Sequence, residues 1–147
     1  MVAIKQLRRI LRRLVQYKEY FGDENAIYRI EHPTYTELSP ELEEFYHLVY
    51  KLKIPDIAFN DSKKTFYGEV IDEAVEKYGV SSFDELCKQE LNYIEIFSIL
   101  TSVVRSCRMD DGFLAAFVES RKGYNILVRC EEILNDLYWA NFIENIH

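Results

Sequence analysis

The chain has 147 residues, a net charge of −7, and a hydrophobic fraction of 48% with only 5 Gly and 3 Pro. The apolar content argues against a disordered chain, and the scarcity of Gly and Pro argues against a β sandwich or barrel, whose many turns require them. The length is that of one domain, which we expect to span residues 1–147.

The same counts disfavour several functional classes. The negative charge disfavours nucleic acid as a partner. No uncharged run is long enough to cross a bilayer, so we expect no transmembrane segment. Cys87, Cys107 and Cys130 are odd in number and far apart, which indicates neither a zinc site nor a disulfide framework, and favours a reduced, cytoplasmic setting. We therefore expect no metal site and no cofactor.

Residues 2–21 follow the spacing of an amphipathic helix, which Gly22 is expected to end. Residues 1–18 contain six cations and no acid, which leaves a net charge of −13 on the rest of the chain. The simplest interpretation is a packed first helix whose cations face water or the acidic remainder. A membrane-surface helix, a nucleic-acid contact and a targeting presequence remain alternatives.

Apolar and polar residues alternate briefly after residue 26, until Pro33 interrupts the pattern. A short β element near residues 27–37 or an extended loop is expected there. Ser39-Pro40 then predicts a helix start, with Ser as the N-cap and Pro in the first turn. We expect that helix to end near Pro55 and a polar linker to cover residues 57–65. Its Glu44-x-x-His47 spacing is seen in di-iron bundles, but the chain has no second copy, so an ordinary surface His is expected.

The central prediction concerns residues 91–107, the most apolar continuous segment. Steps of three and four between apolar residues predict a helix with a wide buried face. Helices over 66–78 and 82–87 are expected before it. Arg105 and Arg108, three residues apart, are expected on neighbouring turns of one side, next to Thr101. They either stabilise the helix end and pair with Glu, or form an anion site, because planar guanidinium groups suit phosphate or carboxylate.

The spacing T-x-x-V-R-x-x-R-x-x-x-G is formed by Thr101, Val104, Arg105, Arg108 and Gly112. It resembles the C-terminal signature of a bacterial family of small, uncharacterised all-helical domains. The segment around Tyr35 and the helix that starts at Ser39 add to this similarity, which spans roughly residues 35–135. The resemblance implies a small helical domain and carries over no activity, substrate or catalytic residue.

The last part of the chain predicts a short helix over residues 113–118, closed by Gly123, and a long helix from about Tyr124 to Ile143. The end of this helix is very apolar. It forms either the last core helix or an interface that includes Tyr138, Trp139 and Phe142.

We therefore expect one all-α domain of five or six helices around a central apolar helix. The leading functional hypothesis is a soluble, non-enzymatic protein-interaction module that uses its terminal helices to bind a second copy, as a homodimer, or another protein. The alternative is a small-molecule or anion-binding domain, enzymes included, centred on Arg105 and Arg108. A cavity containing both guanidinium groups unpaired favours the alternative, and two buried Arg–Glu pairs favour the first hypothesis.

Overall fold

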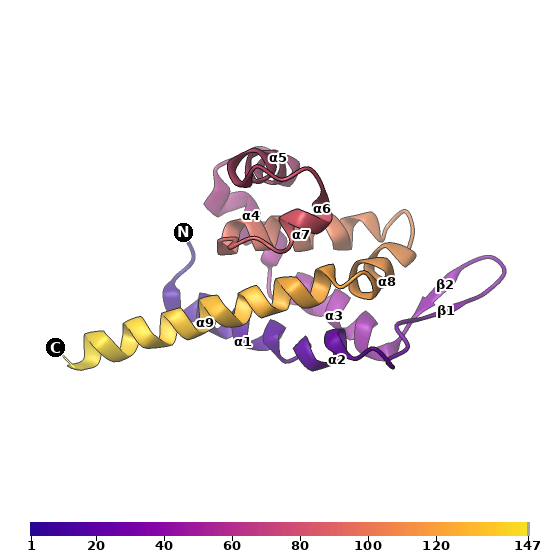
Figure 1. Cartoon of the computed structure of the whole chain (residues 1–147), viewed down its shortest axis with the longest axis horizontal. Coiled ribbons are helices and arrows are strands. Elements are labelled where there is room, and N and C mark those ends of the chain that lie inside the picture. The colour runs from indigo at the N-terminus through magenta and orange to yellow at the C-terminus, as the bar shows by residue number, and fades with distance from the viewer. Residues whose placement is uncertain (147) are drawn as a thin grey trace.

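A computed structural model describes residues 1–146, with side chains described through residue 140. Within these residues the chain forms helices and a single two-stranded hairpin (Figure 1). The elements are α1 (Ile4–Val15), α2 (Lys18–Gly22), β1 (Arg29–Glu31), β2 (Thr36–Leu38), α3 (Pro40–Lys51), α4 (Ile54–Ser62), α5 (Tyr67–Tyr78), α6 (Phe83–Leu86), α7 (Tyr93–Ser106), α8 (Gly112–Glu119) and α9 (Lys122–Ile146).

The helices pack in two groups that meet at α7. Helices α4, α5 and α7 lie together in one group, and α1 runs alongside the long helix α9 in the other (Figure 1). Helix α9 extends past the other helices at its C-terminal end, whereas the β hairpin projects from the opposite end of the molecule (Figure 1). The prediction of an all-α fold and the prediction of a short β element near residues 27–37 are both confirmed.

Helix α7 is the predicted central helix. Every residue from Glu95 to Val104 except Ser102 is buried, so the helix is enclosed on nearly all sides. It begins with a capping box, in which the Asn92 side chain accepts from the Glu95 N–H at 2.9 Å and the Glu95 carboxylate accepts from the Asn92 N–H at 2.8 Å. This box satisfies two backbone donors that would otherwise lack partners, and it separates α7 from α6.

The carboxylate of Asp61 lies inside the fold, which was not expected from the sequence. The Asp61 side chain, 5% exposed, accepts hydrogen bonds from the Val2 N–H at 2.9 Å and the Tyr93 hydroxyl at 2.7 Å, and lies 3.6 Å from the N-terminal ammonium group. Burial acts to raise the pKa of Asp61, but these hydrogen bonds and the ammonium charge together hold it below its ordinary value. Asp61 thus ties the N-terminus to α4 and α7.

Three helix boundaries differ from the predictions. The expected helix over residues 2–21 is interrupted at Gln16 and Tyr17, which divide it into α1 and α2. The expected linker over residues 57–65 is mostly helix α4. Helix α3 already ends at Lys51, and Pro55 lies in the first turn of the new helix, where no N–H is needed.

The third difference concerns Gly123, which does not close α8. The break occurs at Arg121, whose φ of 72° is left-handed, and Gly123 lies inside α9. Its hydrogen allows a close approach, because a Cβ there would lie 3.0 Å from the Phe21 ring and 3.3 Å from the Phe117 ring. Gly123 is therefore required by packing and not by the turn.

Candidate functional sites

The first candidate site is a positively charged surface on α1. One side of this helix is buried through Leu7, Ile10, Leu11 and Leu14. The opposite side carries five cations, which we call the α1 cationic face: Lys5, Arg8, Arg9, Arg12 and Arg13. None of the five forms an ion pair with a carboxylate among the described side chains.

The α1 cations were expected to face either water or the acidic remainder of the chain. Because none of them pairs with a described carboxylate, the structure favours water. Other cations of the fold do find carboxylates at short range. Lys18, which follows α1, lies 2.8 Å from Glu131, and Lys122 lies 2.8 Å from Asp84. Other cations without an ion pair, such as Arg105 and Arg108, are scattered over the fold, whereas α1 carries five of them on one helix.

An aromatic side chain of α9, Tyr138, lies beside the α1 cationic face. The guanidinium carbons of Arg8 and Arg12 lie 5.9 and 5.6 Å from the centre of the Tyr138 ring, and Arg12 donates a hydrogen bond to the Tyr138 hydroxyl. Tyr138 is 41% exposed and Trp139 is 63% exposed. The third predicted interface residue, Phe142, has a side chain outside the part of the chain that the structure describes.

The second candidate site is a cavity of about 450 Å³ between α4, the start of α5, and α7. Arg105 and Lys53 supply its cations, and Thr101 also lines it. The guanidinium carbon of Arg105 lies 5.2 Å from the centre of the Tyr67 ring. Thr101 is buried, and its hydroxyl donates to the Phe97 carbonyl oxygen at 2.7 Å. The Thr101 hydroxyl therefore has no hydrogen left to donate to an anion.

Arg108 does not line this cavity. Helix α7 ends at Ser106, so Arg108 lies in the turn that follows, and the helical spacing that should place it beside Arg105 no longer applies. It lines a separate, smaller cavity together with Asp110 and Asp111. Arg105 and Arg108 are both exposed, and neither forms an ion pair with a described carboxylate. The structure brings Thr101 and Arg105 together, but it separates Arg108 from them.

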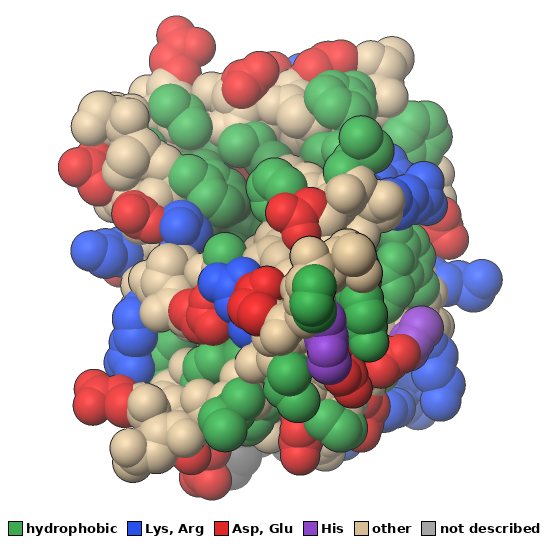
Figure 2. All heavy atoms as spheres, turned by 90° about the vertical axis from the view of Figure 1, so that its right-hand side faces the viewer, with side chains coloured by type: hydrophobic (Ala, Val, Ile, Leu, Met, Phe, Trp, Pro, Cys, Tyr) green, Lys and Arg blue, Asp and Glu red, His purple; other side chains and the backbone are tan. Residues whose placement is uncertain are grey.

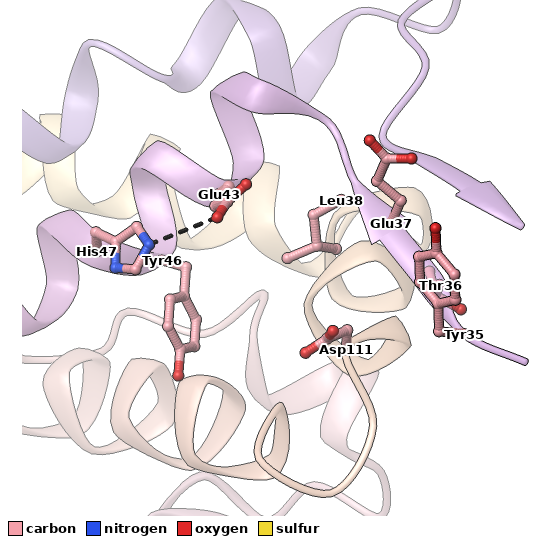
Figure 3. Close-up of a pocket in the computed structure, with 8 residues that line it drawn as sticks. All are labelled: Tyr35, Thr36, Glu37, Leu38, Glu43, Tyr46, His47 and Asp111. Atoms are coloured by element: carbon pink, nitrogen blue, oxygen red, sulfur yellow. Dashed lines mark ion pairs between the residues drawn. The ribbon is translucent and has the colours of Figure 1, made fainter. Parts of the chain in front are cut away.

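A third cavity, of about 310 Å³, lies between the hairpin and α3 and is acidic (Figure 3). Glu43 and Asp111 line it from α3 and from the turn before α8, and His47 lies 3.7 Å from Glu43. Glu37 of β2 also lines it, but its carboxylate points away from these two and is hydrogen-bonded to His32. Burial is the main cause that raises the pKa of Tyr46, which also lines this cavity. Figure 2, which faces the hairpin end, shows histidine side chains among acidic ones.

The described residues include the side-chain types that hold metal ions and the thiols that can act as nucleophiles. No group of three or more His, Cys, Asp or Glu side chains among them is arranged to hold a metal ion. The cysteines are all buried, and burial raises the pKa of Cys87 and of Cys130 to about 12, so these thiols carry almost no thiolate at neutral pH. No described helix is both long enough and apolar enough to cross a lipid bilayer.

Several residues of the Arg105 cavity were missed by sequence reasoning. Lys53 adopts a left-handed φ of 58° between α3 and α4, and Phe59 and Phe66 come from segments that were expected to be a linker and a helix start. In the folded protein Phe59 is 57% exposed and Phe66 is 52% exposed, which the sequence alone did not indicate. An aromatic anchor within a polar segment was the available signal for Phe59.

Comparisons with known proteins add no relative to this description. No protein-family model, no curated protein and no solved structure matches the chain. The resemblance through Thr101, Arg105 and Arg108 therefore stays a prediction, and functional conclusions depend on the geometry above.

Proposed function

We propose that this protein is a non-enzymatic protein-interaction module that binds an acidic surface of another protein through the α1 cationic face and the neighbouring aromatic residues of α9. The observation that carries the proposal is the absence of carboxylate partners for all five α1 cations among the described residues, in a chain with a net charge of −7. Carboxylates are abundant in this chain, yet they lie elsewhere.

Electrostatic complementarity supports an acidic partner. A concentrated patch of one sign speeds association with the opposite sign and fixes the orientation of the complex. Lys5, Arg9 and Arg12 are exposed, and helical spacing places them on one side of α1. A partner with carboxylates along one helix or strand would meet several of them at once.

The aromatic residues supply the second component of such a surface. Tyrosine, tryptophan and arginine are enriched among the residues that dominate binding energies at protein interfaces. Tyr138 lies beside Arg8 and Arg12, and both Tyr138 and the next residue of α9, Trp139, are partly exposed. Burial of these rings by a partner would add an apolar contribution to the electrostatic one.

A different protein suits this surface better than a second copy or another polyanion. A symmetric homodimer through α1 would bring two α1 cationic faces together, and their repulsion opposes it. Nucleic acid and anionic membranes carry negative charge over a large area, so beside the face they also meet part of the −13 on the rest of the chain within a Debye length of about 10 Å at 0.1 M salt, whereas an acidic patch of a protein can be confined to the face.

The test is a titration of the full chain with a short oligo-glutamate peptide at about 50 and about 200 mM salt, a range over which screening changes. Trp139 is the single tryptophan and follows Tyr138 in α9, so its emission is a probe next to this surface. The test variant is Lys5→Gln/Arg9→Gln/Arg13→Gln, which avoids the two arginines on Tyr138. The matched control, Lys51→Gln/Lys63→Gln/Lys88→Gln, removes the same charge from exposed positions elsewhere.

The proposal predicts saturable binding by the wild type that weakens with salt, a loss of about tenfold in the α1 variant, and little change in the control. Equal losses in both variants would reduce the effect to net charge and contradict the proposal. So would tight binding to phosphatidylserine vesicles or duplex DNA without binding to the peptide. A dimer mass in light scattering that the α1 variant converts to a monomer would assign the surface to a second copy instead.

A further inference from the structure

The cavity beside Arg105 combines charge and aromatic surface in a way that the proposed docking role does not use. It is the largest of the cavities described above, and its volume of about 450 Å³ lies within the range of about 300–1,000 Å³ typical of small-molecule sites. We infer that it binds a small carboxylate with a planar aromatic body.

The two cations of the cavity supply the site for the carboxylate. Arg105 has no carboxylate partner among the described residues, and its guanidinium carbon lies 5.2 Å from the centre of the Tyr67 ring. A cation–π contact of this kind does not use the guanidinium N–H donors, which can form paired hydrogen bonds with a carboxylate. Lys53 adds a second positive charge from the turn before α4.

Aromatic rings supply the site for the planar body of the ligand. Phe59 and Phe66 line the cavity and are more than half exposed, so both still have surface to bury. The Phe66 ring lies over Gly68, where a Cβ would be 2.3 Å from a ring carbon, and its centre is 4.4 Å from that of Tyr67. Because Gly68 has no side chain, the Phe66 ring fits beside Tyr67, whose ring is contacted by the Arg105 guanidinium group.

One acidic residue, Asp56, also lines the cavity, together with Asn60 and with Thr65, whose hydroxyl donates to Glu69 and can still accept. The net charge of the lining is therefore +1, from two cations and one acid. This favours a monoanion over a polyanion such as a nucleotide, whose several charges would meet Asp56 without a matching set of cations. The polar groups can orient substituents on the ring.

The experiment is a titration of the full chain with 2-naphthoate, followed by the fluorescence of the ligand. Trp139, the single tryptophan, lies on α9, which contributes no residue to the cavity. 2-Naphthalenemethanol has the same rings without the charge, and acetate, measured by its displacement of 2-naphthoate, has the charge without the rings. Arg105→Gln and Lys53→Gln remove one cation each, Phe66→Ala removes an exposed ring, and Lys51→Gln is the matched control, since Lys51 does not line the cavity.

We expect saturable binding of 2-naphthoate, with the neutral alcohol and acetate each weaker by about tenfold or more, because each lacks one of the two components. Arg105→Gln should weaken binding by about tenfold, Phe66→Ala by about threefold or more, and Lys51→Gln not measurably. Thermal unfolding of each variant verifies that the fold is intact, as expected for exposed positions.

Failure to bind 2-naphthoate at millimolar concentration would overturn the inference, as would equal binding of the neutral alcohol or unchanged binding in Arg105→Gln. The result is separable from the docking proposal. Lys5→Gln/Arg9→Gln/Arg13→Gln should leave 2-naphthoate binding unchanged, and Arg105→Gln should leave the response to oligo-glutamate unchanged.

Discussion

Glu95 is the buried group whose removal tests most sharply how α7 is held in place. Its side chain is 7% exposed and connects three segments. The carboxylate accepts from the Tyr78 hydroxyl at 2.7 Å and from the Asn92 N–H at 2.8 Å, and lies 3.3 Å from the Lys77 ammonium group. Glu95→Ala removes these three contacts but keeps the Asn92 side-chain cap on the Glu95 N–H.

The magnitude follows from what each partner can do afterwards. A hydrogen bond to a charged group contributes about 1.5–3 kcal/mol when the donor is left buried. The Asn92 N–H loses its acceptor outright. The Tyr78 hydroxyl still reaches the Glu90 carbonyl oxygen at 3.0 Å, and Lys77, which is 55% exposed, returns to water. The expected loss of unfolding free energy is therefore about 2–3 kcal/mol, or about 5–10 °C in Tm.

Urea unfolding followed by far-UV circular dichroism measures this loss. The control is Glu90→Ala, the same chemical change at an exposed position five residues earlier, which should cost less than about 0.5 kcal/mol. Glu95→Gln keeps an acceptor oxygen without the charge, so its cost should fall between the two. If Glu95→Ala and Glu90→Ala agreed within about 0.5 kcal/mol, the claimed role of this carboxylate would be refuted.

Three further outcomes are expected. Because the pKa of Asp61 is lower in the folded state, its ionised form stabilises the fold fully above the unfolded pKa of about 3.9, and this stabilisation is lost as pH falls through the folded value. In acid titrations of unfolding, the difference in stability between wild type and Asp61→Asn should thus shrink below about pH 4. A constant difference would contradict this. Gly123→Ala should cost about 1–3 kcal/mol in urea unfolding because its methyl group meets the buried Phe21 ring, and a neutral effect would refute the packing argument. Cys87 and Cys130 should react with a thiol reagent at pH 8 only after denaturation, and fast native labelling of either would contradict their burial.

The features that followed from the sequence were those with a local physical cause. The apolar spacing of residues 91–107 requires burial on a wide face, and α7 is buried from Glu95 to Val104. Ser39 caps α3 as predicted, with its hydroxyl accepting from the Leu42 N–H at 3.1 Å. The brief alternation after residue 26 forms a hairpin in which Ile30 pairs with Glu37. Each of these depends on residues close in sequence.

The features that were missed depend on contacts between distant residues or on where a helix ends. Tyr78 is 17 residues from Glu95, and nothing local indicates that they meet. The prediction that Arg105 and Arg108 lie side by side was wrong because α7 ends at Ser106, between the two residues. Pro55 is compatible both with the end of one helix and with the first turn of the next, and the pattern alone favoured the wrong one.

The candidate sites show the same division. The charge of α1 was evident from the sequence, but whether its cations meet carboxylates is decided by how α1 is placed in the fold. Likewise Arg105 was a candidate from its residue type, whereas the aromatic rings around it come from α4 and the start of α5, which are brought to α7 only by tertiary packing.

The most direct test of the docking proposal is a map of backbone amide shifts of the ¹⁵N-labelled chain during titration with the oligo-glutamate peptide. The account predicts that salt-sensitive shifts concentrate along Ile4–Val15 and along the part of α9 from Glu131 to Ala140. Shifts centred on α5 or on the Arg105 cavity, or the absence of any shift at low salt, would contradict it.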